Sequence, residues 1–197
     1  RVGVPVIVQN TAGAAGLIGS KAIAMAAPDG GTFGYVHSGI VTLQAMGAKI
    51  DMLKDFAPVA PRIQASSFLI LVNSGSPYRS LQELIAAMKA DPQKLSCGTT
   101  GPGSPEYMIF ERLVKAVPGI GAVNVPFKGA IEGVAALMGK QIDFMVGLTS
   151  TARGTVESGK LRALANPGVR RSRLFPDVPT VAEAGVPGFA HSTWGGV

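Results

Sequence analysis

The sequence is poor in the residues that enzymes use most often for nucleophilic catalysis and metal binding. Its 197 residues include one cysteine, Cys97, and two histidines, His37 and His191. A single cysteine excludes an intrachain disulfide, and neither histidine has a partner at the spacing of a metal-binding motif. The G-x-S-x-G motif of serine hydrolases is absent, and the acidic residues are scattered. We therefore expect no enzymatic activity, no metal site and no cofactor.

Aromatic and charged residues are also scarce, at 6% and 15%, whereas hydrophobic residues make up 47%. This composition excludes a disordered chain. No apolar run reaches the roughly 18 residues of a membrane span, and we expect no signal peptide within these residues. Because residues 4–8 already look like a strand and no stop signal follows Trp194, we expect the gene product to extend beyond both ends.

The net charge of +6 favours an anionic ligand or surface. The densest cationic run, which contains Arg170, Arg171 and Arg173, lacks the interleaved aromatic residues that stack on bases. We therefore expect no nucleic acid partner.

Short β-like runs alternate with helical runs along the chain, and Gly and Pro residues separate them. This order predicts an α/β fold with a largely parallel sheet. The expected strands are residues 4–8, 32–36, 56–60, 67–72, 95–98, 123–126, 141–146 and 161–165. The expected helices are residues 13–27, 81–90, 106–117, 130–138, 152–158 and 181–184, and residues 40–46 are expected to be a short helical or irregular piece.

The order of these elements indicates two lobes. Residues 76–162 form a β/α unit of their own, and residues 1–75 together with 163–197 supply the second unit. The chain must then cross between the lobes twice, near residues 74–77 and 161–166. Two crossings form a natural hinge for closure around a ligand.

Residues 99–104 are the most informative segment for function, because they join a strand to a helix. Ser104 is expected to cap the helix, with Pro105 at its first position. The amides of Thr100, Gly101 and Gly103, together with the positive end of the helix, would suit a carboxylate. An ordinary capped helix explains the same residues equally well.

Two other segments also join the end of a strand to a helix, at residues 36–39 and 148–151. Ligands of open α/β sheets bind at such strand ends. The residues expected to face the cleft are His37, Ser38 and Gly39 from one lobe, and Thr99, Thr100, Gly101, Gly103, Ser104, Lys128, Gly129, Thr149 and Ser150 from the other. Lys128 as an exposed surface lysine and His37 as a packing residue remain alternatives.

The glycines of residues 13–19 have the spacing G-x-x-G-x-x-G, not the G-x-G-x-x-G of a dinucleotide site. They indicate a tight helix start, although an oxidoreductase that uses a dinucleotide remains an alternative.

Several longer stretches carry a family resemblance. They are residues 12–16, 18–19, 26–30, 55–59, 80–84, 101–104, 125–129, 159–165 and, most specifically, 175–185. In these stretches the chain resembles the substrate-binding proteins of tripartite tricarboxylate transporters, often called Bug proteins.

The resemblance implies a type II periplasmic binding protein fold, with two α/β lobes, a hinge and a cleft between the lobes. It also implies a periplasmic, non-enzymatic protein that binds a small carboxylate and passes it to membrane transporter subunits. By position, it adds Ala130 to the ligand-binding residues named above. We expect a monomer. A sensory binding protein that docks to a receptor is a further alternative.

Overall fold

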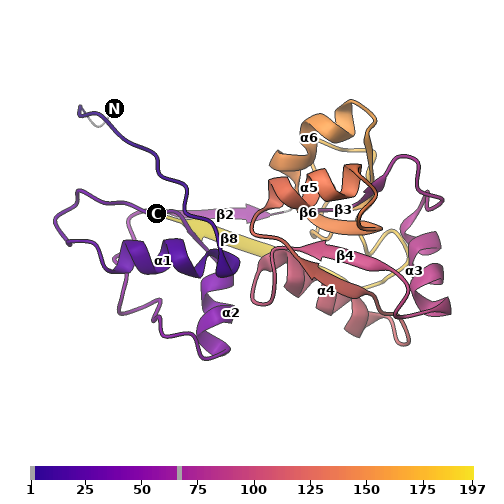
Figure 1. Cartoon of the computed structure of the whole chain (residues 1–197), viewed down its shortest axis with the longest axis horizontal. Helices are drawn as coiled ribbons and strands as arrows, with labels where there is room; N and C mark the ends of the chain where they lie inside the picture. Colours follow the sequence, from indigo (N-terminus) through magenta and orange to yellow (C-terminus); the bar gives the residue numbers. More distant parts are fainter. Residues whose placement is uncertain (1–2, 66–67) are drawn as a thin grey trace.

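The computed structural model describes residues 3–65 and 68–197, which form two lobes connected by a pair of strands (Figure 1). The smaller lobe contains η1 (Ala14–Gly16), α1 (Leu17–Ala24), β1 (Val36–His37) and α2 (Gly39–Ala45). Strands β2 (Pro61–Ala65) and β8 (Ser192–Gly196) run from this lobe toward the larger one. β8 lies between β1 and β2 and pairs antiparallel with both.

The larger lobe is built on a five-stranded sheet with the order β5-β4-β6-β3-β7. Its strands are β3 (Phe68–Asn73), β4 (Ser96–Thr99), β5 (Val123–Pro126), β6 (Phe144–Leu148) and β7 (Leu161–Ala165). β4 is parallel to β5 and β6, whereas β3 is antiparallel to β6 and β7. The expectation of a largely parallel sheet therefore holds for β5, β4 and β6 only.

Four helices cover this sheet: α3 (Leu81–Ala90), α4 (Pro105–Ala116), α5 (Ala130–Met138) and α6 (Thr149–Glu157). β3 is buried on both faces, as its continuous apolar sequence requires. Ile70 and Val72 pack in the core cluster that includes residues of α3 and α4. Leu69 and Leu71 pack in the cluster that includes residues of α5 and α6. The sheet therefore separates two pairs of helices and holds their starts in fixed positions.

Local signals account for the well-predicted elements of the larger lobe. β5, β7 and α5 have the predicted bounds, and α3 begins at its predicted cap. The hydroxyl of Ser80 accepts a hydrogen bond from the Glu83 N–H (3.2 Å), and the Glu83 carboxylate accepts one from the Arg79 N–H (2.6 Å). This is the reciprocal arrangement of a capping box.

The strands predicted at residues 4–8 and 56–60 are wrong, because neither segment has strand structure. Residues 4–8 are exposed, with Ile7 at 92%. A strand needs a hydrogen-bonded partner, and the three-stranded sheet uses β1, β8 and β2 instead. The strand predicted at 32–36 appears only as the two-residue β1, and β8 was not predicted. Residue 67, predicted to begin a strand, lies outside the described residues.

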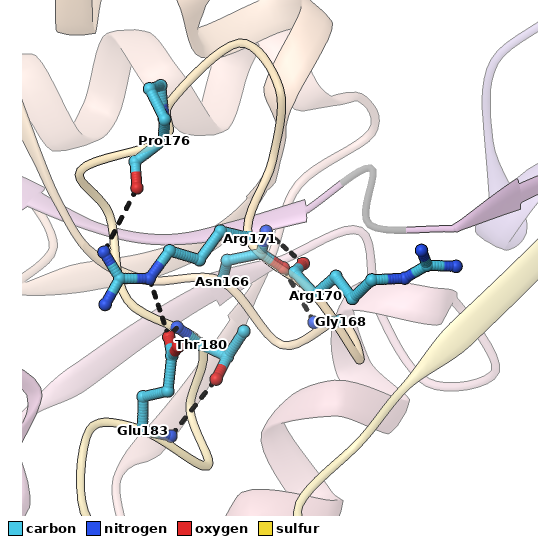
Figure 2. Close-up of polar contacts among 7 residues, drawn as sticks. All are labelled: Asn166, Gly168, Arg170, Arg171, Pro176, Thr180 and Glu183. Carbon is cyan, nitrogen blue, oxygen red and sulfur yellow. Dashed lines mark hydrogen bonds and ion pairs between the residues drawn. The ribbon is translucent and has the colours of Figure 1, made fainter.

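Polar contacts among its own side chains and backbone groups stabilise the segment after β7 (Figure 2). The Arg171 guanidinium donates to the Glu183 carboxylate (2.9 Å) and to the Pro176 carbonyl (3.2 Å). Thr180 and Glu183 form the predicted capping box, at 2.7 and 3.1 Å. The helix predicted at 181–184 is nevertheless wrong, because these residues form turns. Arg171, part of the cationic run, therefore has a structural role inside this lobe.

The strand pairing favours lobe boundaries different from the expected 75/76 and 162/163. β3 and β7 pair with each other in the same sheet as β4 and β6, so residues 68–75 and 163–165 lie with the larger lobe. We propose that the chain crosses between the lobes at the β2–β3 connection and at the start of β8. No helix in the described part of the chain is long and apolar enough to cross a membrane.

Candidate functional site

A cavity of about 270 Å³ lies where the two lobes meet. Its walls come from the η1–α1 region and β1 of the smaller lobe, from β8, and from helix starts of the larger lobe. The lining residues are Ala12, Gly13, Ala15, Gly16, Tyr35, His37, Phe68, Thr100, Pro105, Glu106, Lys128, Ala130, Leu148, Thr193 and Trp194. This volume suits a small metabolite.

The N-terminal ends of four helices meet at this cavity. Gly16 precedes α1, Pro105 begins α4, Ala130 begins α5 and Leu148 precedes α6. At α1, α5 and α6, the residue before the helix makes no side-chain capping bond. Helix N-termini carry unpaired N–H groups and a partial positive charge, so their convergence favours an anion.

The loop that leads into α1 has an unusual backbone. Gly13, Ala14, Ala15 and Gly16 all have positive φ values, of 123°, 48°, 53° and 91°. The Gly16 N–H donates to the Gly13 carbonyl within the loop (3.0 Å). Backbone in the left-handed region is strained for alanine, and such strain is concentrated at binding sites. Three of these four residues line the cavity. We infer that this loop contributes to ligand binding.

His37 presents one ring nitrogen to the same loop. Its Nδ1 accepts a hydrogen bond from the Gly39 N–H (3.1 Å), and burial lowers the pKa of the imidazole below 6.5. The ring is therefore neutral at pH 7 and carries its proton on Nε2. A Cβ atom on Gly16 would lie 3.2 Å from this Nε2, so the donor lies beside the loop. His37 can donate a hydrogen bond to an anion in the cavity.

Glu106 is a buried carboxylate in the cavity wall, with 6% of its surface exposed. It lies in the first turn of α4 and accepts a hydrogen bond from the Thr100 hydroxyl (2.9 Å). Burial raises the pKa of Glu106 above 4.5, and hydrogen bonds from its own N–H and from Thr100 and Ser104 offset this only in part. A carboxylate of the protein therefore already lies at the positive N-terminal end of α4.

The remaining walls are largely apolar and aromatic. Tyr35, Phe68 and Trp194 line the cavity, although the whole chain contains only 3 Tyr, 8 Phe and 1 Trp. Leu148 and Ala130 add aliphatic surface. A ligand with an apolar body would bury that body against these walls.

The lobes contact each other beside the cavity through two glycines. A Cβ atom on Gly39 would lie 3.1 Å from the Gly103 carbonyl oxygen, and one on Gly103 would lie 2.6 Å from Cδ2 of Leu43. Gly103 also has a φ of 89°, which favours glycine. These two positions let α2 approach the loop before α4 closely.

Four of the residues predicted to face the cleft or bind ligand line the cavity: His37, Thr100, Lys128 and Ala130. The others flank it. Gly129 precedes α5, and Ser150 is exposed on α6. Thr149 is 5% exposed, and its hydroxyl has no hydrogen-bond partner in the described part of the chain.

Several predicted donors are used within the protein. The Ser38 N–H donates to the Trp194 carbonyl (3.0 Å), and the Gly39 N–H donates to His37. The Gly101 N–H donates to the Thr99 hydroxyl (3.1 Å), and the Ser104 N–H donates to the Gly101 carbonyl (3.1 Å). Of the three loop amides predicted to bind a carboxylate, that of Gly101 therefore has a partner within the loop, and the ligand role of these residues stays a prediction.

The sequence reading did not assign several lining residues to the site, chiefly Gly13, Ala15, Gly16, Tyr35 and Trp194. The glycine spacing of residues 13–19 is the one local signal for this loop, and it is equally typical of a tight helix start. Nothing in the local sequence of Tyr35 or Trp194 indicates that they meet at one cavity. Within residues 3–65 and 68–197, no group of three His, Cys, Asp or Glu residues could hold a metal ion.

Comparisons with known proteins agree with this architecture. The sequence matches the family described as tripartite tricarboxylate transporter family receptor over residues 1–197. It is 33% identical to Protein BugT of Bordetella pertussis, over 98% of this chain and 60% of that protein. The chain spans about three fifths of the length of the curated relatives it matches.

Solved structures are similar as well. The periplasmic binding protein BugD superposes with a TM-score of 0.88 at 29% identity, covering 96% of this chain and 64% of that one. MatC from Rhodopseudomonas palustris, solved with bound malate, gives 0.81 at 32% identity, with coverages of 93% and 63%. R. palustris Rpa4515, solved with adipate, gives 0.83 at 27% identity, with coverages of 92% and 61%.

Proposed function

Because the chain belongs to the tripartite tricarboxylate transporter family receptor family, we propose that it captures a small carboxylate between its lobes for delivery to membrane transporter subunits. In this proposal the protein acts in the periplasm, as family members named periplasmic binding proteins do. The malate and adipate in the similar structures support a carboxylate ligand.

One observation carries the proposal: the starts of α1, α5 and α6 meet at one cavity without side-chain caps. Their combined partial positive charges, the His37 Nε2–H and the Lys128 ammonium would replace the water around a carboxylate. Each charge-assisted hydrogen bond contributes about 1.5–3 kcal/mol net. A few such bonds reach the roughly 8 kcal/mol of micromolar affinity.

Thermal shift at pH 7.5 against malate, adipate, 6-aminohexanoate, benzoate and NAD tests this function. We expect stabilisation by at least one carboxylate and none by NAD. Stabilisation by NAD alone would favour the oxidoreductase alternative, and no stabilisation by any carboxylate would refute the proposal.

A pair of variants locates the site. Lys128→Gln removes a charge from the cavity wall, whereas Lys160→Gln removes one from an exposed position outside the lining. We expect calorimetry to show about tenfold weaker carboxylate binding for Lys128→Gln only. Equal affinities for the two variants would count against this cavity as the site.

A further inference from the structure

The four helix starts at the cavity are not equivalent. Those of α1, α5 and α6 lack a side-chain cap, whereas the start of α4 has both Ser104 and Glu106. The Ser104 hydroxyl accepts from the Tyr107 N–H (3.2 Å), and the Glu106 carboxylate accepts from the Thr100 hydroxyl (2.9 Å). The first turn of α5 also has a carboxylate, that of Glu132, which accepts from the Lys128 N–H (3.2 Å), but Glu132 is exposed and outside the cavity lining. Of the four helix starts, α4 is therefore the one whose first-turn carboxylate lies in the cavity wall.

The charged residues of the cavity wall also distinguish the α4 end of the cavity from the rest. Among the lining residues, Lys128 is the basic side chain and Glu106 the acidic one, while His37 is neutral. A ligand carboxylate beside Lys128 and the free helix starts would be attracted. Burial raises the pKa of Glu106, so a second ligand carboxylate at the α4 end would meet either a like charge or a carboxyl group that it helps to keep protonated, whereas a ligand ammonium would stabilise the ionised form.

Resting on the proposed function, the geometry points to Glu106 as a specificity-determining residue that restricts the cavity to ligands with one carboxylate and a hydrogen-bond donor at the other end. The donor, an ammonium, amide or hydroxyl group, binds the Glu106 carboxylate. The apolar body between the two ends packs against Phe68, Leu148 and Trp194.

A purely structural role for Glu106 makes a different prediction. Glutamine has nearly the same shape and still offers an oxygen to the Thr100 hydroxyl, so Glu106→Gln preserves this contact while it removes the charge. If Glu106 only caps α4, the substitution leaves ligand preference unchanged. If Glu106 selects the ligand, the substitution changes the order of preference.

Adipate and 6-aminohexanoate form a matched pair of probes, because they have similar chains and differ in one terminal group. Calorimetry at pH 7.5 would compare the whole chain with Glu106→Gln and Glu111→Gln. Glu111 lies on the same helix but is exposed and outside the lining, so it controls for loss of charge. Circular dichroism and thermal melts would establish that each variant is folded.

We expect the unmodified chain and Glu111→Gln to bind 6-aminohexanoate at least tenfold more tightly than adipate, and Glu106→Gln to reverse this order. Adipate binding the unmodified chain as tightly as 6-aminohexanoate would overturn the inference, as would an unchanged ratio in Glu106→Gln. Failure of both probes to bind both proteins would also overturn it. The proposed function fails separately, by the absence of stabilisation across the wider carboxylate panel.

Discussion

Gly16→Ala is the most direct test of how the smaller lobe contributes to binding. Gly16 has a φ of 91°, and the added Cβ would lie 3.2 Å from Nε2 of His37. The left-handed conformation costs an L-residue about 1–2 kcal/mol, so the variant should lose that much stability. The new methyl group would also cover the Nε2–H that is proposed to donate to the ligand.

The expected loss of affinity follows from that donor. A hydrogen bond to a charged group contributes about 1.5–3 kcal/mol net, which corresponds to a roughly 10- to 150-fold rise in Kd. Calorimetry with the tightest carboxylate of the panel measures the Kd, and urea denaturation measures the free energy of unfolding.

Gly30→Ala is the matched control for backbone strain. Gly30 has a φ of 79°, is exposed, and its Cβ would have nothing within 4 Å. Both variants should lose similar stability, but only Gly16→Ala should lose affinity. If the two proteins bind the carboxylate within twofold of each other, the role assigned to His37 and the η1–α1 loop is refuted.

Three further predictions concern the lobe contact, the thiol and the pH dependence. Gly103→Ala places a Cβ 2.6 Å from Cδ2 of Leu43 and should hold the lobes apart, which small-angle scattering would detect as a larger radius of gyration. Gly188→Ala, at a φ of 77° with open space around it, should leave the radius unchanged, and equal radii for the two variants would contradict the reasoning. Cys97 is fully buried and burial raises the pKa of its thiol, so a thiol reagent should label it only in denaturant; rapid labelling of the native protein would disprove this. Because the folded pKa of Glu106 is raised, stability relative to Glu106→Gln should fall as the pH rises from below 4.5 through the folded pKa, and urea melts showing a pH-independent difference would refute it.

Local sequence chemistry explains why the larger lobe was predictable. The Ser80–Glu83 cap specifies the start of α3 without help from distant residues. β3 has a continuous apolar sequence, and its fully buried position matches that pattern. In such elements the turn residues and the hydrophobic pattern agree with the fold, so a reading of nearby residues suffices.

The smaller lobe was less predictable because its sheet depends on distant pairing. In β8, Gly196 pairs with Val36 and Pro61, and its Ser, Thr and Gly residues have no strong strand pattern of their own. Residues 4–8 have such a pattern and form no strand. β-propensity reflects packing and pairing on a sheet more than an intrinsic preference, and here the partner decides.

The candidate site was also only partly predictable from the sequence. The strand-to-helix segments at residues 36–39, 99–104 and 148–151 were located from sequence, but their chemistry depends on side-chain positions. Glu106 was not assigned to the site, and only the fold shows it buried in the cavity wall. A loop that seemed open to a ligand carboxylate thus has a carboxylate of the protein beside it.

The arrangement of the two lobes also constrains how a ligand enters. The contact between α2 and the loop before α4 depends on Gly39 and Gly103, which carry no side chains and leave the facing surfaces smooth. β2 and β8 pair along five residues and connect the lobes. Separation at the glycine contact would then expose the helix starts together, and closure would bring His37 and Lys128 to the same carboxylate. Binding and closure are linked in this scheme because the anion is shared by groups from both lobes.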